Sequence, residues 1–213
     1  MMNKKDIAPK KVYVKIDNSE RYLKVAKELY DKAKHPEQAE IYYAPFVLFC
    51  ATSVEYLLND IFIEYSNRYF SGTDQKIYAE SFMTLGLRAK LLTFLPIVSG
   101  NAYKWDLDSF EYKTLCGMIN KRNQIAHGKD FYQGLSTKDD NDGGFTIDVT
   151  DLKEKAILLL SKNECNNYFK AFESFITLYS LIENNKLKEG KMVLPIVESK
   201  LKTETIQFST RKT

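Results

Sequence analysis

The sequence predicts a mostly helical bundle with a small amount of strand. Apolar residues recur at steps of three and four over long segments, and prolines, glycines and capping residues mark where those segments end. A hydrophobic share of 44% in 213 residues is enough to form a core. Because domains usually take about 100–200 residues, we expect one helical domain over 19–186. An arm over 1–18 precedes it, and a tail over 187–213 follows.

Three helices are predicted in the first half of the chain. The first begins at Asn18-Ser19, which is an N-cap signal, and ends at His35-Pro36, because a residue before proline is pushed out of the helical region. The second covers about 38–70 and contains no glycine. The third covers about 75–98 despite Gly86, and stops near the proline or the Ser-Gly pair at its end.

A fourth helix and a loop follow. Asp108 and Glu111 have capping-box spacing for a helix that runs to Gly128. The polar stretch 133–144 is predicted to be a mobile loop. Counted from Asp139, its acidic run lacks the glutamate that a calcium-binding EF-hand needs at position 12, so we expect no calcium there.

Strand and helix alternate in the last part. Residues 145–149 alternate between apolar and polar, as a strand does. A fifth long helix is predicted from Thr150 or Asp151 to about Asn185. The tail contains Met192–Val197, a candidate edge strand, because proline is tolerated there.

Composition excludes several classes of function. Two histidines and three cysteines without a C-x-x-C pair leave no zinc cluster, and we expect no metal and no cofactor. A net charge of +3 does not by itself indicate nucleic-acid binding. No signal-peptide pattern follows the first residues, and the apolar run 41–51 is interrupted by Pro45 and too short to span a bilayer. We therefore expect a cytoplasmic protein without a membrane partner.

Glu55 lies within an apolar stripe of the second predicted helix. Its neighbours on that face are all apolar: Leu48, Ala51, Leu58 and Phe62. Two interpretations stay open. A buried carboxylate has to be paired and hydrogen-bonded, whereas a stripe that turns slightly leaves Glu55 at its edge, in reach of solvent.

The fourth helix has the same irregularity with the opposite charge. Arg122 interrupts the apolar stripe of Leu115, Met118, Ile119 and Ala126. A guanidinium suits a desolvated pairing because its donors form a planar fork. We therefore predict that Glu55 pairs with Arg122 and fixes its orientation.

A polar face adjoins this stripe. Asn120, Asn123 and His127 follow at steps of three and four. The simplest interpretation of His127 is a histidine that interacts with the C-terminal end of a helix dipole. The nearby Asn123 and Arg122 favour a functional interpretation instead, because His35, the other histidine, lies in a predicted polar loop.

The string from Arg122 to His127, Arg-Asn-Gln-Ile-Ala-His, resembles the R-x4-H signature of the HEPN superfamily (higher eukaryotes and prokaryotes nucleotide-binding). The helix carrying Ala51–Asn59, with Glu55 inside it, is similar to the acidic helix of many HEPN proteins. The resemblance covers roughly residues 38–185. It implies an up-and-down bundle of four to five helices, commonly a homodimer, in which two R-x4-H motifs face each other across a cleft.

The resemblance also implies metal-independent cleavage of RNA by attack of a ribose 2′-OH on the adjacent phosphate. His127 would then act as general base or acid, Arg122 would stabilise phosphate charge, and Asn123 would position either the histidine or the phosphate. Glu55 and Asn120 would support them. Lys121 and Lys129 could contact the RNA backbone, although solvated surface lysines are the simpler interpretation.

Other roles stay open. Many HEPN proteins are non-catalytic nucleotide- or RNA-binding or dimerisation modules, and an accidental match on a partner-binding bundle is a third option. A toxin–antitoxin or phage-defence setting, with an antitoxin protein as partner, is also implied. Lys129 stands where related toxins often carry a tyrosine, so adenylylation at that position is not expected.

Overall fold

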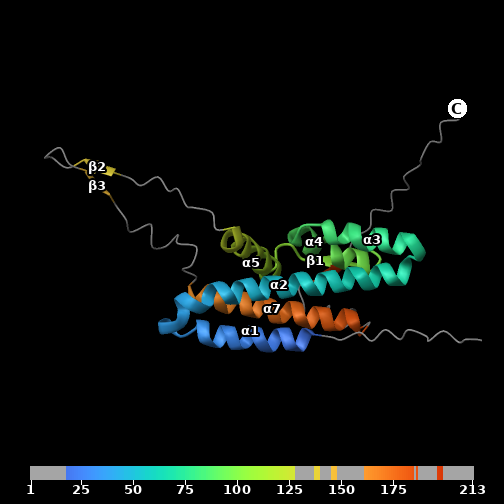
Figure 1. Ribbon diagram of the computed structural model, residues 1–213, viewed down its shortest axis with the longest axis horizontal. Helices are drawn as coiled ribbons and strands as arrows, with labels where there is room; N and C mark the ends of the chain where they lie inside the picture. Colours follow the sequence, from blue (N-terminus) through green and yellow to red (C-terminus); the bar gives the residue numbers. More distant parts are fainter. Residues whose placement is uncertain are drawn as a thin grey trace, which may run out of the picture.

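The structure is a computed structural model that describes residues 18–127, 137–139, 145–147, 161–184, 186 and 196–198 (Figure 1). It confirms the predicted all-α bundle with small strand elements. The elements in chain order are α1 (Ser19–Ala33), α2 (Pro36–Tyr69), α3 (Gly72–Thr84), α4 (Leu87–Val98), β1 (Tyr103–Trp105), α5 (Phe110–His127), β2 (Thr137–Asp139), β3 (Phe145–Ile147), α7 (Lys162–Glu183) and β4 (Ile196–Glu198).

Helix α2 is the centre of the bundle. It packs against α1, α5 and α7 and also contacts α3 and α4, so it touches every other helix of the described part (Figure 1). The core consists mainly of aliphatic and aromatic side chains from α2, α4, α5 and α7, among them Phe46, Leu58, Phe62, Phe94, Leu115, Phe172 and Phe175. A side chain on α2 can therefore meet partners from several helices at once.

Pro45 does not interrupt α2, which runs unbroken for 34 residues. One helix in the described part, over Ile41–Tyr69, is consequently long and apolar enough to cross a membrane by length and composition. The sequence analysis ended the apolar segment at residue 51 and therefore underestimated its length. In its most apolar window, 56% is buried inside the protein, as in the core helix of a soluble protein, so this is weak evidence for a span.

The third predicted helix is two helices. Helix α3 ends before Leu85, α4 begins after Gly86, and both linking residues have extended backbone angles, with ψ of 136° and 149°. The prediction of one helix through Gly86 was wrong. Glycine is a poor helix former, and here Gly86 and the preceding Leu85 both adopt extended backbone angles that end one helix before the next begins. At the other end the helix passes Pro96 and stops at Ser99, before Gly100 with φ of 58°.

Two predicted helix starts also differ from the structure. Helix α5 is capped by Ser109, whose Oγ accepts from the Tyr112 amide at 3.3 Å, and not by Asp108. Helix α7 begins with a capping box between Ser161 and Glu164. The predicted fifth helix is therefore not continuous from residue 151, since Ser161 has an extended backbone; residues 148–160 lie outside the described ranges.

The strands form two antiparallel pairs. The predicted strand over 145–149 appears as β3, which pairs with β2 inside the stretch that we expected to be a loop. The tail contributes β4, at the end of the predicted 192–197 strand, and β4 pairs with β1, which the sequence did not predict. Ile196 in β4 is 4% exposed, so this part of the tail joins the core. The domain boundaries themselves stay a prediction.

Candidate functional site

The predicted pair between α2 and α5 is present. Arg122 Nη2 donates to Glu55 Oε2 at 3.1 Å. The two side chains are 28% and 29% exposed, so each lies at the edge of its apolar stripe and remains in contact with solvent. Both open interpretations of Glu55 hold in part: it is paired, and it lies at the rim of the core. Ala126, expected in the stripe, is exposed, so the stripe ends at Arg122.

A third charged residue, Lys90 on α4, joins this pair and was missed in the sequence. Its side chain is 2% exposed, its Nζ donates to Asn59 Oδ1 at 2.8 Å, and the same nitrogen lies 4.0 Å from Glu55 Oε1. Lys90 interrupts the buried stripe of Leu87, Leu91 and Phe94 on its own helix. The criterion that singled out Glu55 and Arg122 would have found it too.

Asn123 fixes the other edge of the guanidinium. Arg122 Nη1 donates to Asn123 Oδ1 at 2.9 Å, while Nη2 is held by Glu55. The guanidinium is therefore oriented by two acceptors from two helices. One carboxylate faces two cations in this cluster, so the formal charge of Glu55, Lys90 and Arg122 together is a single positive charge.

The structure describes two of the four remaining predicted site residues, Asn120 and Lys121, in full. Asn120 is exposed and Lys121 is half-buried on α5, and the structure places neither of them against Arg122. His127 is the last residue of α5, and its side chain, like all of Lys129, lies outside what the structure describes.

The backbone of α5 nevertheless constrains Arg122 and His127. Because α5 is α-helical through His127, residues five apart diverge by about 140° and are separated by about 7.5 Å along the axis. The backbone of one copy of the chain therefore places the two motif positions on different faces of α5.

The other candidate groups do not form competing sites. His35 is exposed at the start of α2, as expected. All three cysteines are buried and free, and burial raises the pKa of Cys50 and that of Cys165, the latter to about 12. Within the described ranges, no group of three or more His, Cys, Asp or Glu residues is arranged to hold a metal ion.

Comparison with known proteins found no relationship to support or oppose the resemblance. No protein-family model matches the chain, and no curated protein and no solved structure matches it either.

Proposed function

We propose that the chain is a HEPN-like, metal-independent endoribonuclease that acts as a homodimer. The observation that carries the proposal is the held guanidinium: Arg122 is oriented by Glu55 and Asn123 and still reaches solvent. An arginine that is fixed in advance can stabilise charge developing on a phosphate without reorganising during the reaction.

The electrostatics of the cluster support an anionic ligand. A buried lysine beside Glu55 offsets its negative charge, so the carboxylate does not cancel Arg122. The exposed part of the guanidinium thus retains its attraction for phosphate, and a guanidinium is well matched to phosphate oxygens.

The regular helix supports the dimer. Since the Arg122 and His127 positions diverge on α5, the proposed site combines Arg122 of one protomer with His127 of a second copy, an exchange that a two-fold interface makes twice. In the proposed reaction the 2′-OH loses its proton as its oxygen bonds to phosphorus, and the 5′-oxygen leaves with a proton. His127 serves one of these proton transfers, since an imidazole titrates near neutral pH. The products are a 2′,3′-cyclic phosphate and a 5′-OH.

The proposed cellular setting rests on the resemblance alone. It is a cytoplasmic toxin–antitoxin or phage-defence role in which RNA is the substrate and an antitoxin protein is a partner.

The test is cleavage of several purified RNAs, including tRNA, in the presence of EDTA. We expect the wild type to produce fragments with 5′-OH ends, and His127→Ala and Arg122→Ala to lose at least about a hundredfold in rate, the usual size of a general acid–base or oxyanion contribution. His35→Ala and Arg21→Ala are matched controls, because both residues are exposed in the first part of the chain.

Two outcomes would overturn the proposal. Cleavage that survives in both motif variants would remove these residues from the reaction. No cleavage of any RNA by a folded wild type would leave binding or dimerisation as the function, which RNA binding measured with the same variants would then test.

A further inference from the structure

Three aromatic rings form a row from the core to the outer surface of α2. Phe49 and Tyr22 pack against the core, and their rings meet edge to face with centroids 6.2 Å apart. Tyr56 stacks on Tyr22, with ring centroids 6.3 Å apart and ring planes inclined by 22°. Tyr56 is nevertheless 58% exposed. The two inner rings therefore support the third from one side and leave much of it open to solvent.

Tyr56 directly follows Glu55, the residue that orients Arg122. Consecutive residues of an α-helix are about 100° apart around the axis at 3.6 residues per turn. Glu55 pairs with Arg122 of α5 on one flank of α2, and Tyr56 stacks on Tyr22 of α1 on the other flank. Two residues whose positions lie between these directions are half-buried or exposed, namely Thr52 and Ile63. A solvent-facing strip of α2 thus joins the guanidinium to the exposed ring.

The spacing of the guanidinium and the ring suits a strand of nucleic acid. Side chains that end on a helix about 10–12 Å across and point about 100° apart have tips roughly 8–9 Å apart. The Arg122 guanidinium lies 3.1 Å beyond the Glu55 carboxylate. Each phosphate of a strand is flanked by two nucleotides, so a phosphate bound by Arg122 has a neighbouring base within reach of Tyr56.

The chemistry of the exposed ring selects the kind of strand. Every base has a π face, so a tyrosine ring binds bases by stacking without reading their sequence. A base inside a duplex is already stacked on its neighbours, so the ring can bind only an unpaired base. Because Tyr22 already holds the Tyr56 ring, binding immobilises little additional side-chain freedom.

We propose that Tyr56 stacks on a base of single-stranded RNA next to the phosphate that Arg122 binds. This inference rests on the proposed function for the role of Arg122, and it adds the substrate class, which is unpaired rather than duplex RNA. Tyr56 is a binding residue and takes part in no proton transfer.

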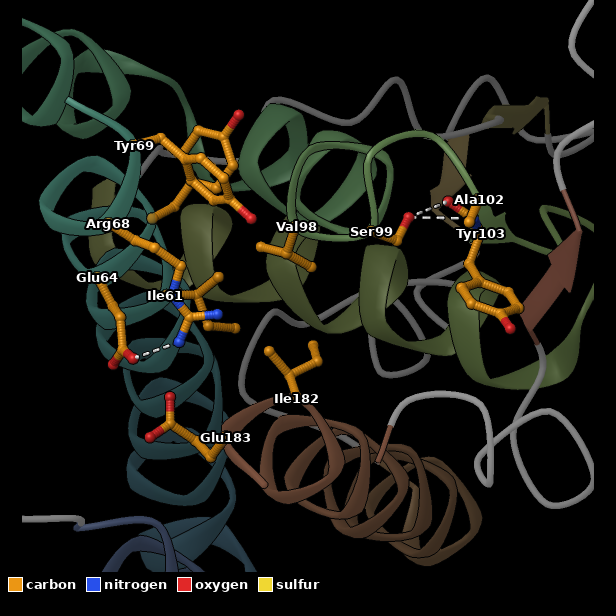
Figure 2. A pocket seen from close by; sticks show the side chains of 11 residues that line it. Ile61, Glu64, Arg68, Tyr69, Val98, Ser99, Ala102, Tyr103, Ile182 and Glu183 are labelled. Atoms are coloured by element: carbon orange, nitrogen blue, oxygen red, sulfur yellow. Dashed lines mark hydrogen bonds and ion pairs between the residues drawn. The ribbon is translucent and has the colours of Figure 1, made fainter. Parts of the chain in front are cut away.

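A pocket at the C-terminal end of α2 provides a matched tyrosine for comparison. Its volume is about 390 Å³, and Figure 2 shows Tyr69 of α2, Val98 of α4 and Ile182 of α7 around it. Tyr69 is 60% exposed and packs on Tyr65 with ring centroids 4.7 Å apart. It therefore matches Tyr56 in exposure and in having an aromatic neighbour on one side, but it lies about 20 Å farther along the helix axis at 1.5 Å per residue.

The experiment measures binding of a short 2′-O-methyl RNA of mixed sequence to the full-length protein by fluorescence anisotropy. This strand lacks the attacking hydroxyl, so it can be bound but not cleaved. We expect Tyr56→Ala to weaken binding about five- to a hundredfold, the usual effect of removing one stacking aromatic. Tyr56→Phe and the control Tyr69→Ala should retain the wild-type affinity. Affinity for the same strand annealed to its complement should not change in Tyr56→Ala.

A second measurement reports on the stacking itself. Trp105 is the single tryptophan of the chain and is 2% exposed, so Tyr56→Trp adds one exposed indole. We expect the oligonucleotide to quench this added emission, because a base stacked on an indole quenches it, and to leave the wild-type emission unchanged. Tyr69→Trp should bind the strand without quenching. Circular dichroism verifies that each variant is folded.

Several results would overturn the inference. They are an unchanged affinity in Tyr56→Ala, an equal loss in Tyr69→Ala, an unquenched Tyr56→Trp, and the absence of binding by the folded wild type. The ribonuclease proposal fails separately. A wild type that binds through Tyr56 but cleaves no RNA would keep the stacking site and remove the reaction. Cleavage that needs Arg122, together with an unchanged affinity in Tyr56→Ala, would remove the stacking site and keep the reaction.

Discussion

We predict that the loss in free energy of unfolding caused by Glu55→Gln is larger when the buried ammonium of Lys90 is present than when residue 90 is uncharged. In the wild type, Glu55→Gln leaves Lys90, which is 2% exposed, without the carboxylate that lies 4.0 Å away. In a Lys90→Met background the same substitution removes a carboxylate whose cationic partner among the described residues is Arg122, with a side chain that is 28% exposed and hydrated.

The structure sets the size of this difference. At 4.0 Å, and an effective dielectric constant of 20, the attraction between unit charges is about 4 kcal/mol. Asn59 still accepts from the ammonium, and the Glu55 side chain is 29% exposed, so the net loss is smaller. We expect Glu55→Gln to lower the free energy of unfolding by about 2 kcal/mol when Lys90 is present, and by less than about 1 kcal/mol in the Lys90→Met background.

Chemical denaturation followed by circular dichroism measures all four proteins of this cycle. Glu80→Gln is the control, because its pair with Lys76 is at least 67% exposed on both sides, and it should cost no more than about 0.5 kcal/mol. An equal cost of Glu55→Gln in both backgrounds would show that Lys90 and Glu55 are not coupled, and would refute the cluster as described.

Two further predictions concern stability. Ser161→Ala breaks the capping box with Glu164 and should cost about 1 kcal/mol, while Ser161→Thr should retain most of the cap; equal losses in the two variants would contradict the capping role. Burial raises the pKa of Cys165 and that of Tyr168 to about 12, from 9.0 and 10.0, with a smaller contribution from Glu164. Unfolding therefore releases protons at high pH, so these two groups should leave the melting temperature unchanged between about pH 7 and 9 and lower it between pH 9 and 12. Tyr168→Phe should reduce the fall above pH 10, and exposed Tyr56→Phe should not; parallel curves for wild type and Tyr168→Phe would be the contrary result.

Sequence patterns anticipated the helices where the apolar period and a strong stop signal agree. The end of α1 before Pro36 follows from the clash of proline with a preceding helical residue, and it lies where that rule places it. The patterns failed where two signals competed. Around Gly86 the apolar spacing continues across a position at which the backbone leaves the helix, and at Ser161 a capping box outweighs the helical period. Strand β1 has only three residues, too few for a periodic signal.

The candidate site also has some features that the sequence predicts and others that depend on how the helices pack. The sequence by itself determined that Glu55 and Arg122 interrupt apolar stripes, because helical spacing fixes which residues share a face. It also determined that His127 closes its helix, next to a glycine. Only the tertiary structure decided that Lys90 lies against Glu55, and that the end of α2 meets the ends of α4 and α7 in a pocket. These contacts join residues on different helices, and their geometry is set by how the helices pack rather than by any spacing along the chain.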